Sequence, residues 1–185
     1  IKFGKGLESI GAEAFVGCHV FFRDDPNPYV ILEFSEGLEV IGDRAFYGCG
    51  MIRVNKLPDS IKHIGAEAFK DCNFLNFNFP SSLEYVGERA FSYEYYYYNG
   101  SVDSLVIDDD IELPSGLTEV GDYAFSALDV SGVKVLIPEK LTSIGKMAFN
   151  GCKYEVDSKN KEYTSIDGCL YSKDKKTFIS ACNTD

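Results

Sequence analysis

The sequence predicts an α/β repeat solenoid, in which one short unit of chain is stacked on copies of itself. The phrase Leu/Ile-x-x-Ile/Val-Gly-x-x-Ala-Phe occurs six times, beginning at residues 7, 38, 61, 83, 117 and 141. Three of the steps between copies are 22 to 24 residues long, a period that indicates stacked supersecondary units. The two longer steps, of 31 and 34 residues, are interpreted as the same unit carrying insertions near 19–30 and 93–110.

Each repeat is predicted to contribute one strand before the phrase. Most copies follow a short run of alternating apolar and polar residues that ends at proline, namely Pro58, Pro80, Pro114 or Pro138. Alternation is typical of strands, and proline removes a backbone donor where pairing stops. The runs 1–4 and 32–35 fit the same place without proline. Asn55 falls at an inward position, so the strand is either bulged there or buries an amide bonded to a neighbouring coil.

The phrase itself is predicted to build the core. Its Leu and its Ile or Val point inward, and its glycine turns the chain because glycine tolerates positive φ and close backbone approach. The Ala and Phe that follow are expected on the buried side of one or two helical turns. We expect the phrase phenylalanines to form a ladder: Phe15, Phe46, Phe69, Phe91, Phe125 and Phe149.

The chain after Cys152 is predicted to cap the solenoid, because the last apolar rung must be covered. It contains one more strand near 154–156 and then a hairpin with strands at 163–166, 169–172 and 177–181. We therefore expect a single domain over 1–185, with six repeats in 1–152 and the final strand and cap in 153–185. No such cap is visible at Ile1, which predicts that the native array continues upstream.

The strand-proline run followed by the repeated IGxxAF phrase resembles the BspA-like (Treponema pallidum type) leucine-rich repeat family, over nearly the whole chain. The resemblance implies a leucine-rich-repeat right-handed superhelix, with a parallel sheet on one face and short helical segments opposite. It also implies a bacterial secreted or cell-surface protein, several relatives of which adhere to host or extracellular matrix proteins. The signal and anchor would then lie outside this sequence.

Charge and hydropathy restrict the partners. The net charge of −11, from 29 acidic against 18 basic residues, argues against nucleic acid or anionic lipid as the main partner. No apolar run reaches the roughly 18 residues of a membrane span, so no direct membrane insertion is expected. The ligand that the family resemblance implies is a protein or a glycan.

Four of the six cysteines occupy the third position after the phrase phenylalanine: Cys18, Cys49, Cys72 and Cys152. Glu94 and Leu128 fill this position in the other repeats, which favours a small buried slot holding free thiols. Stacked slots would also bring Cys18 and Cys49, or Cys49 and Cys72, within bonding reach. A bridge between Cys169 and Cys182 is an open alternative, and the absence of a CxxC pair disfavours zinc.

No catalytic residues, metal or cofactor are predicted. His19 and His63 do not lie beside a recognisable nucleophile, and no glycine-rich phosphate loop is present. Asp108, Asp109 and Asp110 lack the spacing of a calcium loop and are interpreted as a solvated acidic turn.

The outward residues of the predicted strands form the candidate binding surface, since a solenoid of this kind usually binds on its exposed sheet face. Alignment of the strands at the terminal proline, or at its equivalent where there is none, gives one row: Lys2, Glu33, Lys56, Asn78, Glu112, Leu136 and Glu155. A second row lies two residues earlier: Ile31, Val54, Asn76, Asp110, Lys134 and Lys153. Tyr95, Tyr96, Tyr97 and Tyr98 either form a further binding patch or pack their insertion onto the solenoid. The alternative function is a structural spacer within a longer surface protein.

Overall fold

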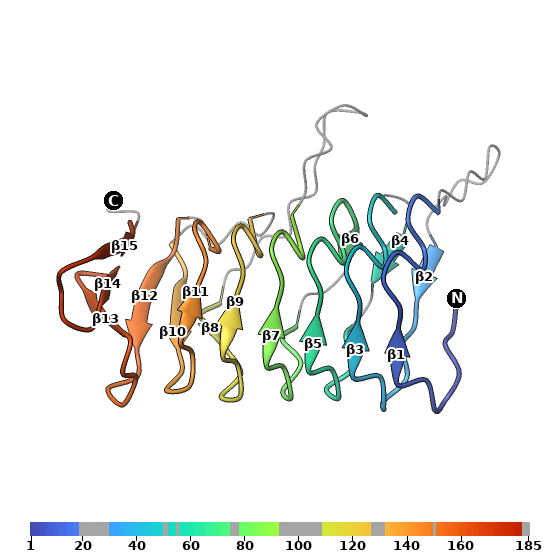
Figure 1. The fold of residues 1–185 in the computed structure, drawn as a ribbon, viewed down its shortest axis with the longest axis horizontal. Helices are drawn as coiled ribbons and strands as arrows, with labels where there is room; N and C mark the ends of the chain where they lie inside the picture. The colour runs from blue at the N-terminus through green and yellow to red at the C-terminus, as the bar shows by residue number, and fades with distance from the viewer. Residues whose placement is uncertain are drawn as a thin grey trace.

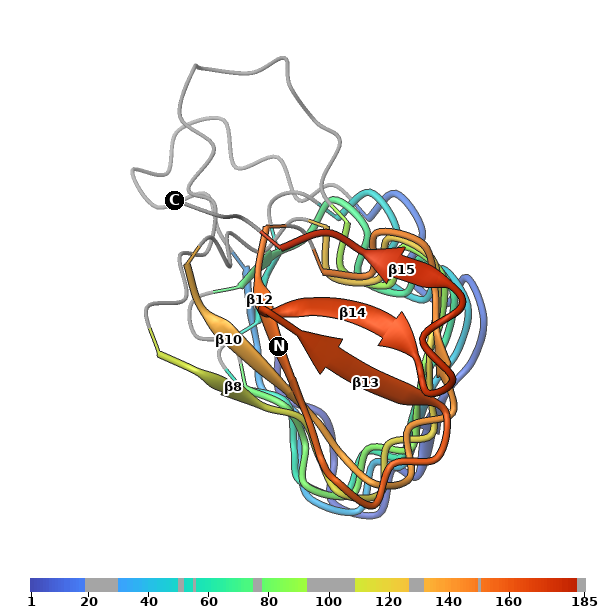
Figure 2. The same ribbon diagram turned by 90° about the vertical axis from the view of Figure 1, so that its left-hand side faces the viewer.

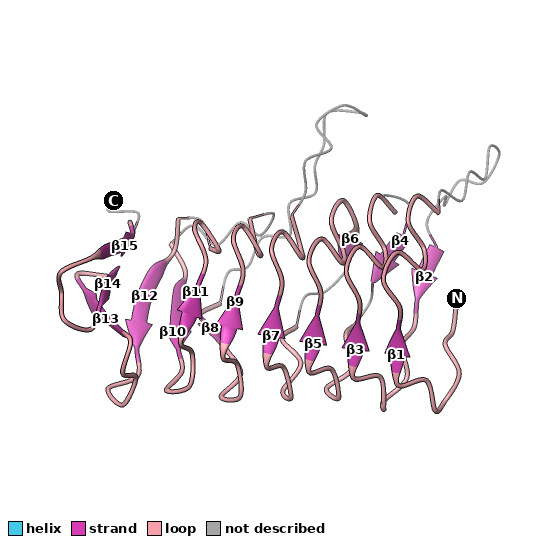
Figure 3. Ribbon diagram, in the orientation of Figure 1, coloured by secondary structure: helices cyan, strands magenta, loops and turns pink. Residues whose placement is uncertain are grey.

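The computed structural model describes residues 1–18, 30–49, 52–54, 56–74, 78–92, 109–126, 132–149 and 151–182. The chain winds as coils stacked along one axis (Figure 1), and its last strands cross one end of the stack (Figure 2). Within these ranges the chain forms strands, turns and loops but no helix (Figure 3).

A six-stranded parallel sheet, which we call the regular wall, runs through all the repeats. Its strands, in spatial order, are β1 (Ser9–Ile10), β3 (Val40–Ile41), β5 (His63–Ile64), β7 (Tyr85–Val86), β9 (Glu119–Val120) and β11 (Ser143–Ile144). Each strand ends directly before the phrase glycine, and its second residue packs in or against the core. The sequence analysis placed these residues in the core correctly but predicted no strand there.

The opposite side, which we call the broken wall, consists of two three-stranded parallel sheets. One contains β2 (Val30–Leu32), β4 (Ile52–Val54) and β6 (Asn73–Phe74), and the other contains β8 (Ile111–Glu112), β10 (Lys134–Ile137) and β12 (Lys153–Val156). The strands predicted before Pro114 and Pro138, and the extra strand after Cys152, are confirmed. In the fourth repeat the observed strand is Asn73–Phe74, earlier than the run that ends at Pro80.

The predicted helical segments are wrong, and the reason lies in the backbone. In every copy the residue before the alanine has φ between 49° and 58°, outside the range of a right-handed helix. The backbone donors of this segment bond to the next coil: Arg44 N donates to Ala66 O and Phe46 N to Ala68 O, both at 2.8 Å. Because these donors are used between coils, the segment is a stack of turns, and the fold is a β-solenoid.

The phrase glycines are needed for close approach and not for positive φ. None of them lies in the left-handed region. A Cβ added at Gly42 would stand 2.6 Å from the backbone nitrogen of Ala12 in the preceding coil. At Gly11, where no described coil precedes it, an added Cβ would meet nothing within 4 Å. Neighbouring coils therefore pack backbone against backbone at this position.

The phenylalanine ladder is confirmed and forms the centre of the core. Successive rings from Phe15 to Phe149 are stacked, with centroids 4.9 to 5.6 Å apart and planes within 14°. All are buried except Phe15, which is partly exposed in the first coil. Burial of one such side chain stabilises the fold by about 2–3 kcal/mol.

The predicted terminal cap is also confirmed. Strands β13 (Tyr163–Ile166), β14 (Cys169–Ser172) and β15 (Phe178–Ser180) form an antiparallel sheet over the last coil (Figure 2). The Tyr163 hydroxyl accepts from Ile144 N at 2.9 Å and donates to Thr142 O at 3.1 Å, so it satisfies backbone groups at the open edge of β11. The buried Asn160 amide donates to the carbonyls of Pro138 and Leu141.

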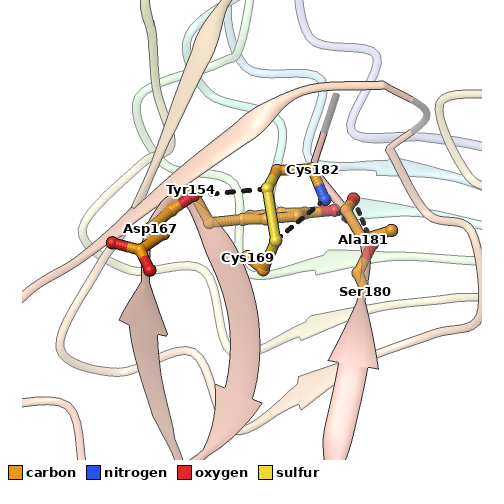
Figure 4. The surroundings of a disulfide bond; sticks show 6 residues. All are labelled: Tyr154, Asp167, Cys169, Ser180, Ala181 and Cys182. Atoms are coloured by element: carbon orange, nitrogen blue, oxygen red, sulfur yellow. Dashed lines mark hydrogen bonds between the residues drawn. A yellow bond between two sulfur atoms is a disulfide. The ribbon is translucent and has the colours of Figure 1, made fainter. Parts of the chain in front are cut away.

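The cysteines fall into two groups. Cys169 and Cys182 form a disulfide that joins the start of β14 to the segment after β15 (Figure 4). The other four are free; Cys49, Cys72 and Cys152 are buried as predicted, whereas Cys18 is exposed. Burial raises the pKa of Cys49 and of Cys152 to about 11 and that of Cys72 well above its ordinary value. The buried thiols therefore stay protonated at neutral pH.

Candidate functional site

The C-terminal half of the broken wall carries the predicted outward row in register. Glu112, Leu136 and Glu155 are direct neighbours across β8, β10 and β12. Lys134 Nζ lies 2.9 Å from a Glu155 carboxylate oxygen and 4.0 Å from one of Asp110. Asp110 also accepts a hydrogen bond from Lys134 N at 3.0 Å. The charges on this half of the wall are therefore largely paired with one another.

The N-terminal half departs from the prediction by one residue. Lys2 pairs with Glu33 as expected, with their charged groups 3.9 Å apart. Leu32 pairs with Val54, however, so that Ile31 faces Arg53. The prediction that Val54 points outward is wrong, because Val54 is fully buried. Val54 and Leu57 are both buried with two residues between them, which breaks the alternation used for the alignment; Asn55 lies outside the described residues.

Lys56 and Asn78, two members of the same row, have different surroundings. Lys56 is exposed, with its ammonium 3.4 Å from Asp59. The Asn78 side chain accepts from Leu57 N and donates to Leu57 O, both at 3.1 Å. Asn78 thus satisfies two backbone groups of the preceding coil. A binding role for Asn78 remains a prediction, but its structural role is clear.

Some of the predicted binding residues lie outside the described residues: Asn76, Tyr95, Tyr96, Tyr97 and Tyr98. His19 and Asp108, for which no site was predicted, also lie outside them. Within the described ranges, no three His, Cys, Asp or Glu side chains are grouped in a way that could hold a metal ion. Across the same ranges we find no helix with the length and hydropathy needed to cross a membrane.

The regular wall carries a surface that the sequence analysis missed. The outward strand residues, in order, are Ser9, Val40, His63, Tyr85, Glu119 and Ser143. The His63 and Tyr85 rings stack with centroids 4.3 Å apart and planes 6° apart. Val40, on the adjoining strand, is 37% exposed. These three side chains, one aliphatic and two aromatic, lie in a row over β3, β5 and β7 that we call the aromatic strip. The sequence does show these residues, because they occupy the second of the two variable positions between the inward Leu and Ile of each phrase.

Acidic residues surround the aromatic strip. Glu119 is the direct neighbour of Tyr85 across β7 and β9. Partial burial, followed by the charges of Glu119 and Asp43, raises the pKa of Tyr85. Lys62 lies 2.9 Å from Glu39; this hydrogen bond, with the charges of Glu39 and Glu84, raises the Lys62 pKa. Carboxylates therefore outnumber basic groups beside the strip, where Lys62 is accompanied by Glu39, Asp43, Glu84 and Glu119.

The turn edge beside the regular wall shows how this protein holds a guanidinium group. Arg44 Nη1 donates to a Glu13 carboxylate oxygen at 2.9 Å, and its guanidinium carbon lies 4.6 Å from the centre of the Tyr47 ring. Arg89 lies over Tyr123 at 5.0 Å in the same manner. Each of these arginines therefore contacts a tyrosine ring and a carboxylate, which is Glu13 of the preceding coil for Arg44 and the adjacent Glu88 for Arg89.

Stacked coils with a buried phenylalanine ladder, parallel sheets and a terminal cap define a leucine-rich-repeat solenoid domain. The model of the BspA type Leucine rich repeat region (6 copies) matches residues 20–108 and 93–183. The chain belongs to this family. No functionally curated protein matches it.

One solved structure of a longer protein shows the same kind of fold, and two others are similar to a smaller degree. A leucine-rich repeat protein from Eubacterium ventriosum ATCC 27560 is 24% identical with a TM-score of 0.56, covering 82% of this chain and 38% of that one. Pneumococcal vaccine antigen PcpA is 20% identical with a TM-score of 0.42, covering 98% and 36%. A leucine rich cell surface protein from Faecalibacterium prausnitzii A2-165 is 19% identical with a TM-score of 0.31, covering 94% and 53%. The chain spans less than two thirds of each.

Proposed function

We propose that the chain is a non-catalytic protein- or glycan-binding repeat domain of a bacterial secreted or cell-surface protein, acting in adhesion or host interaction. One observation carries the proposal: buried positions repeat from coil to coil, whereas outward positions on both walls change. The core thus requires a similar apolar residue at each inward place, and phenylalanine throughout the ladder from Phe46 to Phe149. The outward residues are free to specify a partner, as in other solenoids that bind along an extended face.

The pattern of cysteines supports an extracellular location. The Cys169–Cys182 disulfide is of the kind that persists in oxidising compartments. The free thiols at Cys49, Cys72 and Cys152 are buried and have raised pKa values, so they resist oxidation in the same compartment. A secreted domain with this arrangement forms one bridge and keeps its core thiols reduced.

The proposal is tested by direct binding. The purified chain is passed over immobilised fibronectin, fibrinogen, collagen and laminin, and over a glycan array, with albumin-coated surfaces as the control. Saturable binding with a dissociation constant of about 10 µM or tighter is expected for at least one of these ligands, since weak, transient interfaces lie in this range. Absence of saturable binding on every surface would refute a binding function for the isolated domain.

A structural spacer is the second candidate, favoured by the continuity of the coils. Backbone hydrogen bonds join each phrase to the next, and the phenylalanine stack runs through all six of them. Such a stack is a stiff rod. If it acts only as a spacer, deletion of two coils from the full-length protein reduces cell adhesion, whereas replacement of outward residues on both walls leaves adhesion unchanged. The opposite pattern excludes the spacer.

A further inference from the structure

We infer that the regular wall is a docking surface for an arginine-rich, cationic segment of a partner protein. This inference rests on the proposed binding function and names its surface and partner class. The docking surface consists of the aromatic strip Val40, His63 and Tyr85 together with the exposed carboxylates Glu84 and Glu119 beside it.

The aromatic strip is placed where the fold does not require it. The equivalent outward positions in the other coils are small or polar: Ser9, Glu119 and Ser143. These coils form the same sheet in the same register, so the wall needs no ring at this position. Exposed aromatic residues at the centre of a face are typical of interfaces, where they provide rigid contact area. The stacked His63 and Tyr85 rings thus mark the centre of the docking surface.

The charges on the wall select a cationic partner. Three rows of side chains run along this wall. They consist of the outward strand residues, the residue before each of these, and the residue after each phrase glycine. Seven positions in these rows are acidic and two are lysine. One of these lysines, Lys62, pairs with Glu39, as Lys134 pairs with Glu155 on the broken wall, so the regular wall keeps an excess of carboxylates. An acidic wall repels a second copy of itself, which excludes self-association through this face. The excess negative charge instead attracts Lys- or Arg-bearing segments.

The surroundings of Tyr85 favour arginine over lysine. Tyr85 and Glu119 lie side by side on adjacent strands, and Glu84 precedes Tyr85 on β7. At the turn edge, Tyr47 and Glu13 hold the guanidinium of Arg44 with the same two kinds of group, 4.6 Å from the ring centre, whereas the Lys70 ammonium lies farther from the same ring at 5.6 Å. A planar guanidinium stacks on a ring and bonds a carboxylate at once, whereas an ammonium is a compact point charge. A partner's arginine can therefore reproduce at Tyr85 the contact that Arg44 makes within the chain.

The test uses a fluorescein-labelled twelve-residue peptide with arginine at every second position and serine between, measured by fluorescence anisotropy in 150 mM NaCl. We expect saturable binding by the intact chain. The Glu84→Gln/Glu119→Gln variant should bind about tenfold more weakly, because two charge contacts are lost. The His63→Ala/Tyr85→Ala variant keeps the acidic residues and should lose at least about fivefold. A lysine-for-arginine peptide should bind more weakly than the arginine peptide.

The matched control is Glu33→Gln/Glu112→Gln, which removes the same charge from the broken wall and should change the affinity by less than about twofold. Thermal unfolding checks that all variants remain folded. If the arginine peptide does not bind, the inference is wrong. If the two Gln variants lose affinity equally, binding depends on the overall negative charge and the inference is also wrong. If a ligand from the binding panel keeps its affinity for both regular-wall variants, the proposed function stands and this docking surface is wrong.

Discussion

The two walls of the solenoid are built from the same repeats but tolerate change differently. The regular wall runs unbroken through β1, β3, β5, β7, β9 and β11, whereas the broken wall is split into two sheets of three strands. The long insertions both precede strands of the broken wall, at β2 and β8. On the regular wall, glycine brings neighbouring backbones into contact and leaves no space for extra chain. The two long insertions are therefore found before strands of the broken wall, away from the glycine contacts.

Side chains pair charges and satisfy backbone groups on both walls, as Asn78 does on the broken wall and Asp43 and Lys62 do on the regular wall. The two walls differ at the outward positions of their strands. On the regular wall, hydrogen bonds between adjacent backbones already hold the coils, so outward side chains such as Tyr85 are not needed for the ladder. This difference teaches that the more regular side of a repeat protein is also the side with more freedom for recognition.

The largest expected effect is the loss of a rung shared by both walls. Phe69→Ala should lower the free energy of unfolding by about 3–5 kcal/mol, because the fully buried ring leaves a cavity between Phe46 and Phe91. Phe79→Ala, near the broken wall and only partly buried, should cost less than about 3 kcal/mol. Urea unfolding measures both. Equal costs would show that the ladder is no more important than its surroundings.

Gly65→Ala tests close approach on the regular wall. The added Cβ would stand 2.5 Å from Asp43 N, so neighbouring coils must separate, and we expect a loss of about 1–3 kcal/mol. Gly11→Ala is the control, since its Cβ would meet nothing within 4 Å; it should change stability by less than about 0.5 kcal/mol. A comparable loss in both variants, measured by urea unfolding, would mean that local conformation rather than coil packing requires the glycine.

The smallest expected effect concerns the broken wall. Asn78→Ala leaves two backbone groups of Leu57 without their partner and should cost about 1–2 kcal/mol. Lys56→Ala removes only an exposed ion pair and should cost about 0.5 kcal/mol or less. Thermal unfolding compares the two. If Lys56→Ala costs more stability than Asn78→Ala, Asn78 has no structural role. Asn78 can then be mutated to test binding alone.

Several features of the fold were predictable because repetition reveals which positions are equivalent. The six phrases identified the ladder from Phe15 to Phe149 without any knowledge of the structure. The end of the repetition after Cys152 identified the cap, and the strands predicted at 163–166 and 169–172 do pair as a hairpin. The register of β8, β10 and β12 followed from alternation and terminal prolines.

Other features depended on contacts between residues more than twenty positions apart. A turn forms where a helix was predicted, because Phe46 N donates its hydrogen bond to an acceptor in the next coil. The inward position of Val54 follows from its pairing with Leu32 and could not be obtained from alignment at Pro58. The aromatic strip was missed for the same reason, because His63 and Tyr85 become neighbours only when β5 and β7 pair.

The sequence by itself determined that this protein is a stack of equivalent coils, which rings lie inside it and how its C-terminal end is closed. Only the tertiary structure decided that the coils, over the residues it describes, have two sheet walls and no helix. It also decided that one wall is acidic around a stacked His63–Tyr85 pair. The physical reason is that the residue types along the chain show which positions are buried. The acceptor of each backbone donor and the neighbour of each outward side chain, however, depend on how the coils pack against one another.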